Sequence, residues 1–298
     1  MPVLLPQCIV PLILTARKSN VPFVSEAGAR QRMHERLLRP ASFAPPERLD
    51  GVIVSRRVPQ PEGWPVYDVE PTEADARPES AVVYVHGGGW VNEIVEPHWQ
   101  LIARIARETG QRVVVPVYPL IPFGSARAVR DGVIALIRAE LDSGVQVKLA
   151  GDSSGGQIAL SAALALRDAG TVLPATVLLS PGLDLTWQNP EIEAVQPSDP
   201  WLARPGGRVL ADEWRAGDAL EDPAVSTLFG DMRGLGPLTI VTGARDVLNP
   251  DAHVLRRKAR AQGVPVSWHE GRGQLHVFAL LPTWAGDQGA RVIVSSLN

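Results

Sequence analysis

The stretch Val145-Gln-Val-Lys-Leu-Ala150, Gly151-Asp-Ser-Ser-Gly-Gly156 passes from a short apolar run into a cluster of glycines. The run has the length of a buried strand, and residues 154–167 that follow have the apolar period of a helix. We therefore expect a strand, a tight turn and a helix in immediate succession at this point. Such a unit is the repeating element of an α/β fold.

The same alternation extends outward along the chain. Further strands are predicted at 82–86, 113–117, 175–179, 238–242 and 265–270, and helices at 97–109, 126–140, 250–262 and 285–297. The strand segments are continuously apolar, which indicates that both faces of the sheet are covered by helices. The predicted fold class is α/β, with a mostly parallel, doubly wound sheet.

Two regions break the alternation. Residues 15–50 are polar, Arg-rich and helical in pattern, and residues 185–232 hold Trp187, Trp201 and Trp214 among Pro, Gly and Asp. A long irregular insertion in a compact domain is usually a functional cover or is disordered, and the tryptophans favour a cover. We expect one domain, residues 1–298, whose core is formed by residues 51–184 and 233–298.

Composition excludes several classes of protein. The 298 residues carry 29 Lys and Arg against 32 Asp and Glu, a formal net charge of -3, and one cysteine. Nucleic-acid binding is not expected because it needs clustered positive charge. An internal disulfide and a thiolate-rich zinc site are excluded by the single cysteine.

The apolar start, residues 3–14, is interrupted by prolines and lacks preceding basic residues. It is too short to span a bilayer, which takes about 20 residues, and does not read as a signal peptide. We expect it to pack on the protein or on a partner, so a homodimer is left open. A cytoplasmic location is the default expectation.

A G-x-S-x-G pattern spans Gly151 to Gly155, between the predicted strand and helix. In that context the pattern indicates a nucleophile elbow, with Ser153 held at the carboxyl end of the sheet. A phosphate-binding turn is the alternative, but the segment lacks the spacing of a dinucleotide fingerprint and the Lys-Ser/Thr of a P-loop. Ser154 is the competing nucleophile, although at its position the useful group is the backbone N–H.

A second glycine cluster, His86-Gly-Gly-Gly-Trp90, comes directly after the apolar strand residues 82–85. Glycines let backbone N–H groups approach an anion closely, as stabilisation of an oxyanion requires. We expect the oxyanion donors to be the N–H groups of Gly87, Gly88 and Ser154. His86 is expected to hold the loop by hydrogen bonding.

Together these two segments resemble the hormone-sensitive-lipase-like family of α/β-hydrolase esterases. The resemblance runs from about Ala81 to His276 and includes Ser180-Pro-Gly-Leu-Asp184, while Pro119 stands where the family commonly has Arg. It implies an α/β-hydrolase fold with a helical cap, formed here by residues 15–50 and 185–232, over an acyl pocket. It also implies hydrolysis of short- to medium-chain esters.

A serine nucleophile needs a histidine base and a carboxylate, which follow it in this order in α/β-hydrolases. Of the later histidines, His253 falls in a predicted helix and His269 in a strand, whereas His276 lies in the loop beyond the last strand. His276 is therefore the predicted base. Asp246 follows the strand 238–242, and the family's Gly-x-x-Asp-x-Leu segment favours it as the acid over Asp184 and Asp251.

The sequence therefore predicts a serine carboxylesterase with Ser153, Asp246 and His276 as its catalytic residues and a small-molecule ester as its substrate. Trp90, Trp187, Trp201 and Trp214 are candidate substrate contacts. We expect no metal and no other cofactor, since no H-E-x-x-H or dinucleotide fingerprint is present. A binding protein without catalysis, an acyltransferase and a lactonase are the alternatives.

Overall fold

The computed structural model describes residues 4–59, 63–72 and 77–298. Within these residues the strands form an eight-stranded sheet in the order β1-β2-β4-β3-β5-β6-β7-β8. They are β1 Val52–Arg57, β2 Val66–Pro71, β3 Ser80–Val85, β4 Arg112–Pro116, β5 Gln146–Asp152, β6 Thr176–Leu179, β7 Leu238–Gly243 and β8 Val266–Gly271. β2 runs antiparallel to β1 and β4, and all other neighbours are parallel. The prediction of a mostly parallel sheet is confirmed.

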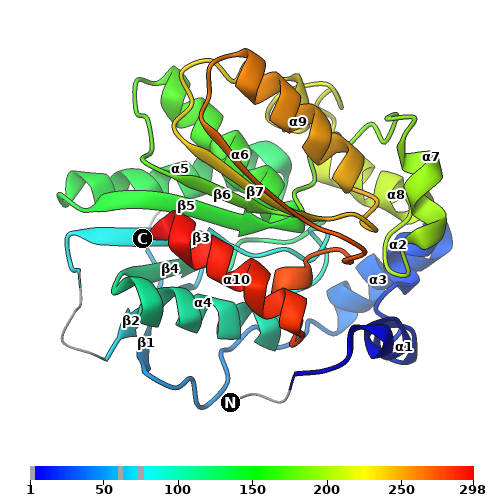
Figure 1. The fold of residues 1–298 in the computed structure, drawn as a ribbon, viewed down its shortest axis with the longest axis horizontal. Coiled ribbons are helices and arrows are strands. Elements are labelled where there is room, and N and C mark those ends of the chain that lie inside the picture. Colours follow the sequence, from blue (N-terminus) through cyan, green and yellow to red (C-terminus); the bar gives the residue numbers. More distant parts are fainter. Residues whose placement is uncertain (1–3, 60–62, 73–76) are drawn as a thin grey trace.

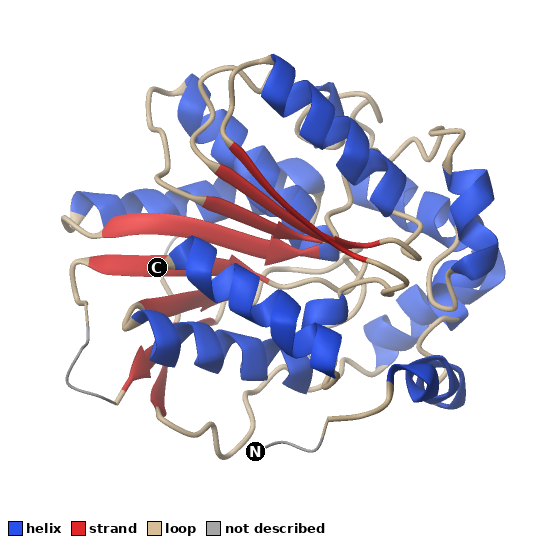
Figure 2. Ribbon diagram, viewed as in Figure 1, coloured by secondary structure: helices blue, strands red, loops and turns tan. Residues whose placement is uncertain are grey.

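The helices are α1 Val10–Ala16, α2 Val21–Val24, α3 Glu26–Leu38, α4 Glu96–Thr109, α5 Ala126–Asp142, α6 Ser153–Asp168, α7 Ile192–Val195, α8 Arg204–Arg215, α9 Asn249–Ala261 and α10 Trp284–Leu297. Figures 1 and 2 show α4 and α10 on one face of the sheet and α5, α6 and α9 on the other. Val82 and Val83 of β3 belong to the two opposite core clusters. This is what the alternation of side chains along a strand between two buried faces requires.

The sequence did not predict β1 and β2, because charged residues interrupt their apolar pattern. Arg57 of β1 pairs with Asp68 of β2 at 2.7 Å, and Arg112 of β4 pairs with the same carboxylate at 2.6 Å. Arg57 and Arg112 also both bond Glu140 of α5. Since a buried charge is tolerated when it is paired, these strands join the sheet without continuous apolar runs.

The two regions expected to form a cap lie against each other. Helices α1, α2, α3, α7 and α8 gather on the right of Figure 1, at the carboxyl ends of the parallel strands. α2 and α3 contact α8, and Gly206 of α8 lies so close to the carbonyls of Pro22 and Phe23 that a Cβ there would clash. The packing agrees with a cap, whose boundaries stay a prediction.

The apolar N-terminal segment packs on the body of the protein where it is described. Val10 and Leu14 of α1 are buried against Leu275, in the loop that follows β8. Val3 lies outside the described residues. No helix in the described ranges is both long and apolar enough to cross a membrane.

Candidate active site

The turn between β5 and α6 has the geometry of a nucleophile elbow. Ser153 is the first residue of α6 and has φ +53°, in the left-handed region that a residue with a Cβ rarely adopts. Gly155 lies against the carbonyls of Val85 and His86, where a Cβ would clash with both. The Ser153 hydroxyl is thereby held at the carboxyl end of the sheet, where the α6 dipole favours negative charge.

Ser153 at the start of α6, Asp246 in the loop after β7 and His276 in the loop after β8 are brought together at one edge of the sheet. His276 Nε2 lies 2.9 Å from Ser153 Oγ, and His276 Nδ1 lies 2.9 Å from Asp246 Oδ2. The second Asp246 oxygen accepts the N–H of Leu248 at 2.9 Å. His276 is 3% exposed and Asp246 0%. The three side chains predicted to act together therefore form one continuous hydrogen-bonded chain.

The surroundings of His276 favour its protonated form. Burial by itself lowers the pKa of His276, but the charge of Asp246 and the hydrogen bond to it outweigh burial and raise the pKa above 6.5. An imidazolium formed at this position would therefore be stabilised by the adjacent carboxylate.

The competing histidines and carboxylates have partners elsewhere. These contacts are His253 with Glu270, His269 with the ring of Phe278, Asp184 with Thr186, and Asp251 with Asn189. None of the four is hydrogen-bonded to Ser153 or His276, all of them lying in described parts of the chain.

The geometry of the oxyanion loop differs from the prediction at Gly87, one of the three expected N–H donors. The Gly87 N–H donates to Asp152 Oδ1 at 3.0 Å, so it is already occupied and holds the loop instead. The Gly89 N–H donates to Ser154 Oγ at 3.0 Å. The Gly88 N–H has no hydrogen-bond partner among the described residues. The Ser154 N–H lies in the first turn of α6, where helical N–H groups have no partner within the helix.

Two side chains fix the peptides on either side of Gly88. His86 Nδ1 donates to the Gly87 carbonyl at 2.7 Å, as expected for a histidine that shapes the loop, and Asn92 Nδ2 donates to the Gly88 carbonyl at 3.0 Å. Because a trans peptide is planar, its carbonyl and its N–H point in opposite directions. The bond from His86 therefore also sets the direction of the Gly88 N–H.

Asp152 and Asn92 are functional candidates that sequence reasoning missed. Asp152 is 1% exposed and accepts from the Tyr84 hydroxyl at 2.9 Å and from His98 Nε2 at 3.3 Å, as well as from Gly87. Burial raises its pKa, but the His98 and Tyr84 contacts outweigh burial and leave the pKa lowered. The only signal was the acidic residue directly before Ser153, inside the glycine cluster.

A cavity of about 40 Å³ lies beside Ser153. Gly89 and Ser154 line it from the core, and Phe23 and Leu210 line it from the two cap regions. This volume is small beside the roughly 300–1,000 Å³ of pockets that hold drug-sized ligands. The cavity therefore fits a small group next to the nucleophile.

Two of the four candidate tryptophans line this cavity, namely Trp90 and Trp187. Trp214 is 0% exposed, stacks behind Trp90 at 5.7 Å between ring centroids and donates its indole N–H to Gln157. Trp201 lies edge-on to the His276 ring, with centroids 5.6 Å apart. Trp214 is therefore fully buried in the packing of the cap. Trp201 packs on the base, and its contact with substrate stays a prediction.

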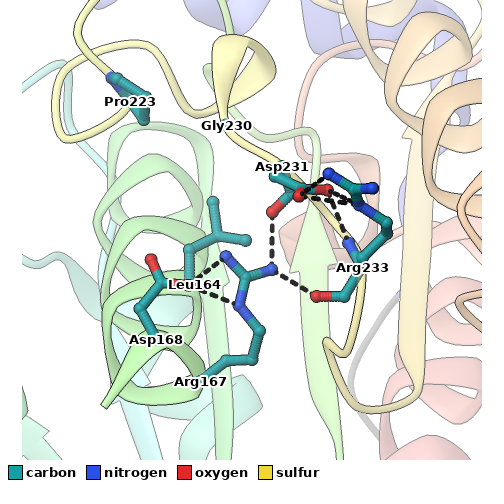
Figure 3. Close-up of a pocket in the computed structure, with 7 residues that line it drawn as sticks. All are labelled: Leu164, Arg167, Asp168, Pro223, Gly230, Asp231 and Arg233. Carbon is teal, nitrogen blue, oxygen red and sulfur yellow. Dashed lines mark hydrogen bonds and ion pairs between the residues drawn. The ribbon is translucent and has the colours of Figure 1, made fainter.

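A larger cavity of about 350 Å³ lies away from this site, between the end of α6 and the loop that holds Asp231 and Arg233. Figure 3 shows that its charged groups pair with one another, Arg167 with Asp168 and Arg233 with Asp231. α6 rises about 1.5 Å per residue, so its far end is roughly 20 Å from Ser153. This hollow is not part of the Ser153 site.

The chain is similar to known ester hydrolases. Residues 82–280 match a family model described as alpha/beta hydrolase fold. A triacylglycerol lipase of Mycobacterium tuberculosis is 35% identical over 208 residues, covering 68% of this chain and 43% of the lipase, so the chain spans less than half of that relative. An acetyl-hydrolase of Streptomyces hygroscopicus is 33% identical over 214 residues, covering 70% of this chain and 71% of that protein.

Among solved structures, an esterase from the bacterial hormone-sensitive lipase family superposes with a TM-score of 0.81. The two chains are 24% identical and the match covers 100% of each, a likeness that shows the fold. With its His-Gly-Gly-Gly and Gly-Asp-Ser-Ser-Gly segments, the chain belongs to the α/β-hydrolase fold family and, within it, to the hormone-sensitive-lipase-like esterases.

Proposed function

We propose that this protein is a serine carboxylesterase that hydrolyses short- to medium-chain esters through an acyl-enzyme. The observation that carries the proposal is the continuous chain from Asp246 through His276 to Ser153, with both hydrogen bonds at 2.9 Å. A serine hydroxyl becomes an effective nucleophile when a positioned base accepts its proton.

In the proposed reaction, Ser153 Oγ attacks the acyl carbon while His276 Nε2 takes the hydroxyl proton. His276 then gives that proton to the leaving alkoxide as the ester bond breaks, which leaves the acyl group on Ser153. Water next attacks the acyl-enzyme as His276 accepts one of its protons. His276 then returns that proton to Ser153 Oγ as the bond from Oγ to the acyl group breaks, and the carboxylic acid is released. Asp246 holds the imidazole in the required tautomer and stabilises the imidazolium in both steps.

The developing oxyanion would be held by the N–H groups of Gly88 and Ser154. Both are backbone donors fixed before the reaction, one by the His86 contact to the preceding carbonyl and the other by its place in α6. Removing a single donor of this kind in other enzymes costs about 3–4 kcal/mol of transition-state stabilisation.

The acyl group favoured by this cavity lies at the short end of the proposed range. The space beside Ser153 is about 40 Å³ and is lined by Trp90, Trp187 and Leu210. One relative is named an acetyl-hydrolase, which agrees with a small acyl group. Activity should fall as the acyl chain outgrows this cavity, because lengthening requires the cap to open.

The same three residues would serve a lactonase or an acyltransferase, which differ only in the alcohol or nucleophile that meets the acyl-enzyme. A protein that binds a small molecule without catalysis is less well supported, since a binder needs no base hydrogen-bonded to the serine. A single-domain organisation with a cap, a cytoplasmic location and a homodimer stay predictions of the sequence.

The test is hydrolysis of p-nitrophenyl acetate, butyrate, octanoate and laurate by the wild type and Ser153→Ala. We expect activity that declines with chain length and is lost in the variant. If added alcohol takes most of the acyl group in place of water, the protein is an acyltransferase. If lactones are hydrolysed in preference to all four esters, it is a lactonase. Equal hydrolysis by both proteins would refute the assignment of Ser153.

A further inference from the structure

A short segment of the cap is fastened to the loop that carries the acid. The guanidinium of Arg245 donates to the Ser198 carbonyl through Nε at 3.1 Å and Nη2 at 2.9 Å. The N–H of Val247 donates to Asp199 Oδ2 at 2.8 Å. The residues on both sides of Asp246 therefore bond this one segment.

The same carboxylate fixes the ring that contacts the base. Asp199 Oδ1 accepts the N–H groups of Trp201 at 2.8 Å and Leu202 at 3.0 Å. This turn holds the Trp201 ring edge-on to His276, with centroids 5.6 Å apart and planes at 85°. The Asp199 side chain thus anchors both the loop that carries Asp246 and the Trp201 ring that packs on His276.

The charges that face His276 come from three segments besides its own: the end of β5, the loop after β7 and the cap segment that holds Asp199. Asp246 bonds it directly, and Asp199 and Asp152 act on it at longer range, each raising its pKa. Burial and the charge of Asp246 raise the pKa of Asp199 to about 6, whereas His276 and the N–H groups of Val247 and Leu202 act in the opposite direction. Asp199 is therefore mostly ionised at neutral pH.

We propose that Asp199 is a positioning residue of the ester-hydrolysing site, anchoring the acid loop and Trp201 and adding a second negative charge beside the His276 imidazolium. The inference rests on the proposed function, in which His276 becomes positively charged each time it takes a proton from Ser153. A second carboxylate close to this pair lowers the energy of that state. It acts through His276 and does not touch the substrate.

The variant Asp199→Asn removes the charge and keeps the shape of the side chain, while its NH2 group replaces one of the two oxygens that accept backbone N–H groups. With less negative charge nearby, the protonated form of His276 is less favoured, so the acid limb of kcat/KM should move to lower pH by about 0.5 unit or more. Above that limb kcat should fall by about 3- to 10-fold while KM changes little, because the charge matters most in the transition state. Asp199→Glu should keep the His276 pKa closer to that of the wild type.

Asp212→Asn is the matched control, since it removes one negative charge from the exposed side of α8, where the Asp212 side chain is 68% exposed. Asp212→Asn should leave the pH dependence of kcat/KM unchanged. An Asp199→Asn profile that loses activity equally at every pH, with no displacement of the limb, would overturn the proposal and leave Asp199 as a structural anchor.

Titration of the His276 ring by NMR in the wild type and in Asp199→Asn gives a readout that requires no activity. The pKa of His276 should be lower in the variant, and equal pKa values in the two proteins would contradict the coupling. Failure of the proposed function would appear separately, as ester hydrolysis that survives Ser153→Ala.

Discussion

Asp152 accepts a hydrogen bond from the N–H of Gly87 at 3.0 Å, which ties the residue before the nucleophile to the first glycine of the oxyanion loop. The two segments that make up the catalytic surface are thus joined by one buried carboxylate. Tyr84 and His98 complete its partners from β3 and α4. Their donors would lose their acceptor if this carboxylate were removed.

Asp152→Ala should lower the free energy of unfolding by about 3 kcal/mol or more, since each buried polar group left unpaired costs roughly 1–3 kcal/mol. Asp152→Asn, which retains an oxygen acceptor, should cost less. Urea denaturation at fixed pH measures both. Stability of the alanine variant equal to the wild type would contradict the proposed role of Asp152 in holding the loop.

The contribution of the Asp152 charge should also depend on pH. Because the pKa of Asp152 is lowered by folding, the charge stabilises the protein above its unfolded pKa of 3.8. This stabilisation is lost as the pH falls through the lower, folded value. The difference in unfolding free energy between wild type and Asp152→Asn should therefore shrink below about pH 4.

Ester hydrolysis should require neutral His276. Its pKa lies above 6.5, so kcat/KM is expected to fall on the acid side with a midpoint above that value. By linkage, protonated His276 stabilises the fold fully below its unfolded pKa, and this is lost as the pH rises through the folded pKa. A profile that stays flat through this range would point to another base.

Leu210→Ala should enlarge the cavity beside Ser153, since Leu210 lines it and is 1% exposed. The ratio of kcat/KM for p-nitrophenyl octanoate to that for acetate should rise by about 10-fold, as a few methylenes gain room. Leu255→Ala is the control, because Leu255 is 0% exposed in α9 and does not line the cavity. If the octanoate-to-acetate ratio rises as much in Leu255→Ala, the effect comes from a general loosening of the protein and not from the cavity.

Arg112→Met should destabilise the protein by about 1–3 kcal/mol, because it leaves Asp68 and Glu140 with one cation, Arg57. The cost is below that of a fully buried pair since the Arg112 side chain is 22% exposed. Arg233→Met breaks only an exposed pair with Asp231, whose side chains are 75% and 44% exposed, and should leave the free energy of unfolding nearly unchanged. Equal losses of unfolding free energy in the two variants would show that the buried network stabilises the protein no more than an exposed ion pair does.

The sequence was sufficient to predict those parts of the fold and site that a local pattern of residues determines. The apolar runs predicted the parallel strands, and the glycines around Ser153 predicted the turn that holds its hydroxyl. The loop positions of Asp246 and His276 after β7 and β8 predicted their proximity, because the carboxyl ends of parallel strands meet at one edge of the sheet.

What the sequence could not provide depends on partners distant in the chain. Asp68 lies in a strand because Arg57 and Arg112 neutralise it. Gly87 was expected to donate to the oxyanion, since nothing local shows that Asp152 takes its N–H. The four tryptophans look alike in sequence, and only packing separates Trp90 and Trp187 at the cavity from Trp201 and Trp214.

The most direct test of the account is mass spectrometry of the protein after reaction with a fluorophosphonate probe, followed by mapping of the labelled peptide. We predict a single adduct on Ser153, absent in Ser153→Ala, retained in Ser154→Ala, and formed far more slowly in His276→Gln. An adduct on any other residue, or labelling that persists in Ser153→Ala, would contradict the claim that Ser153 is the nucleophile activated by His276.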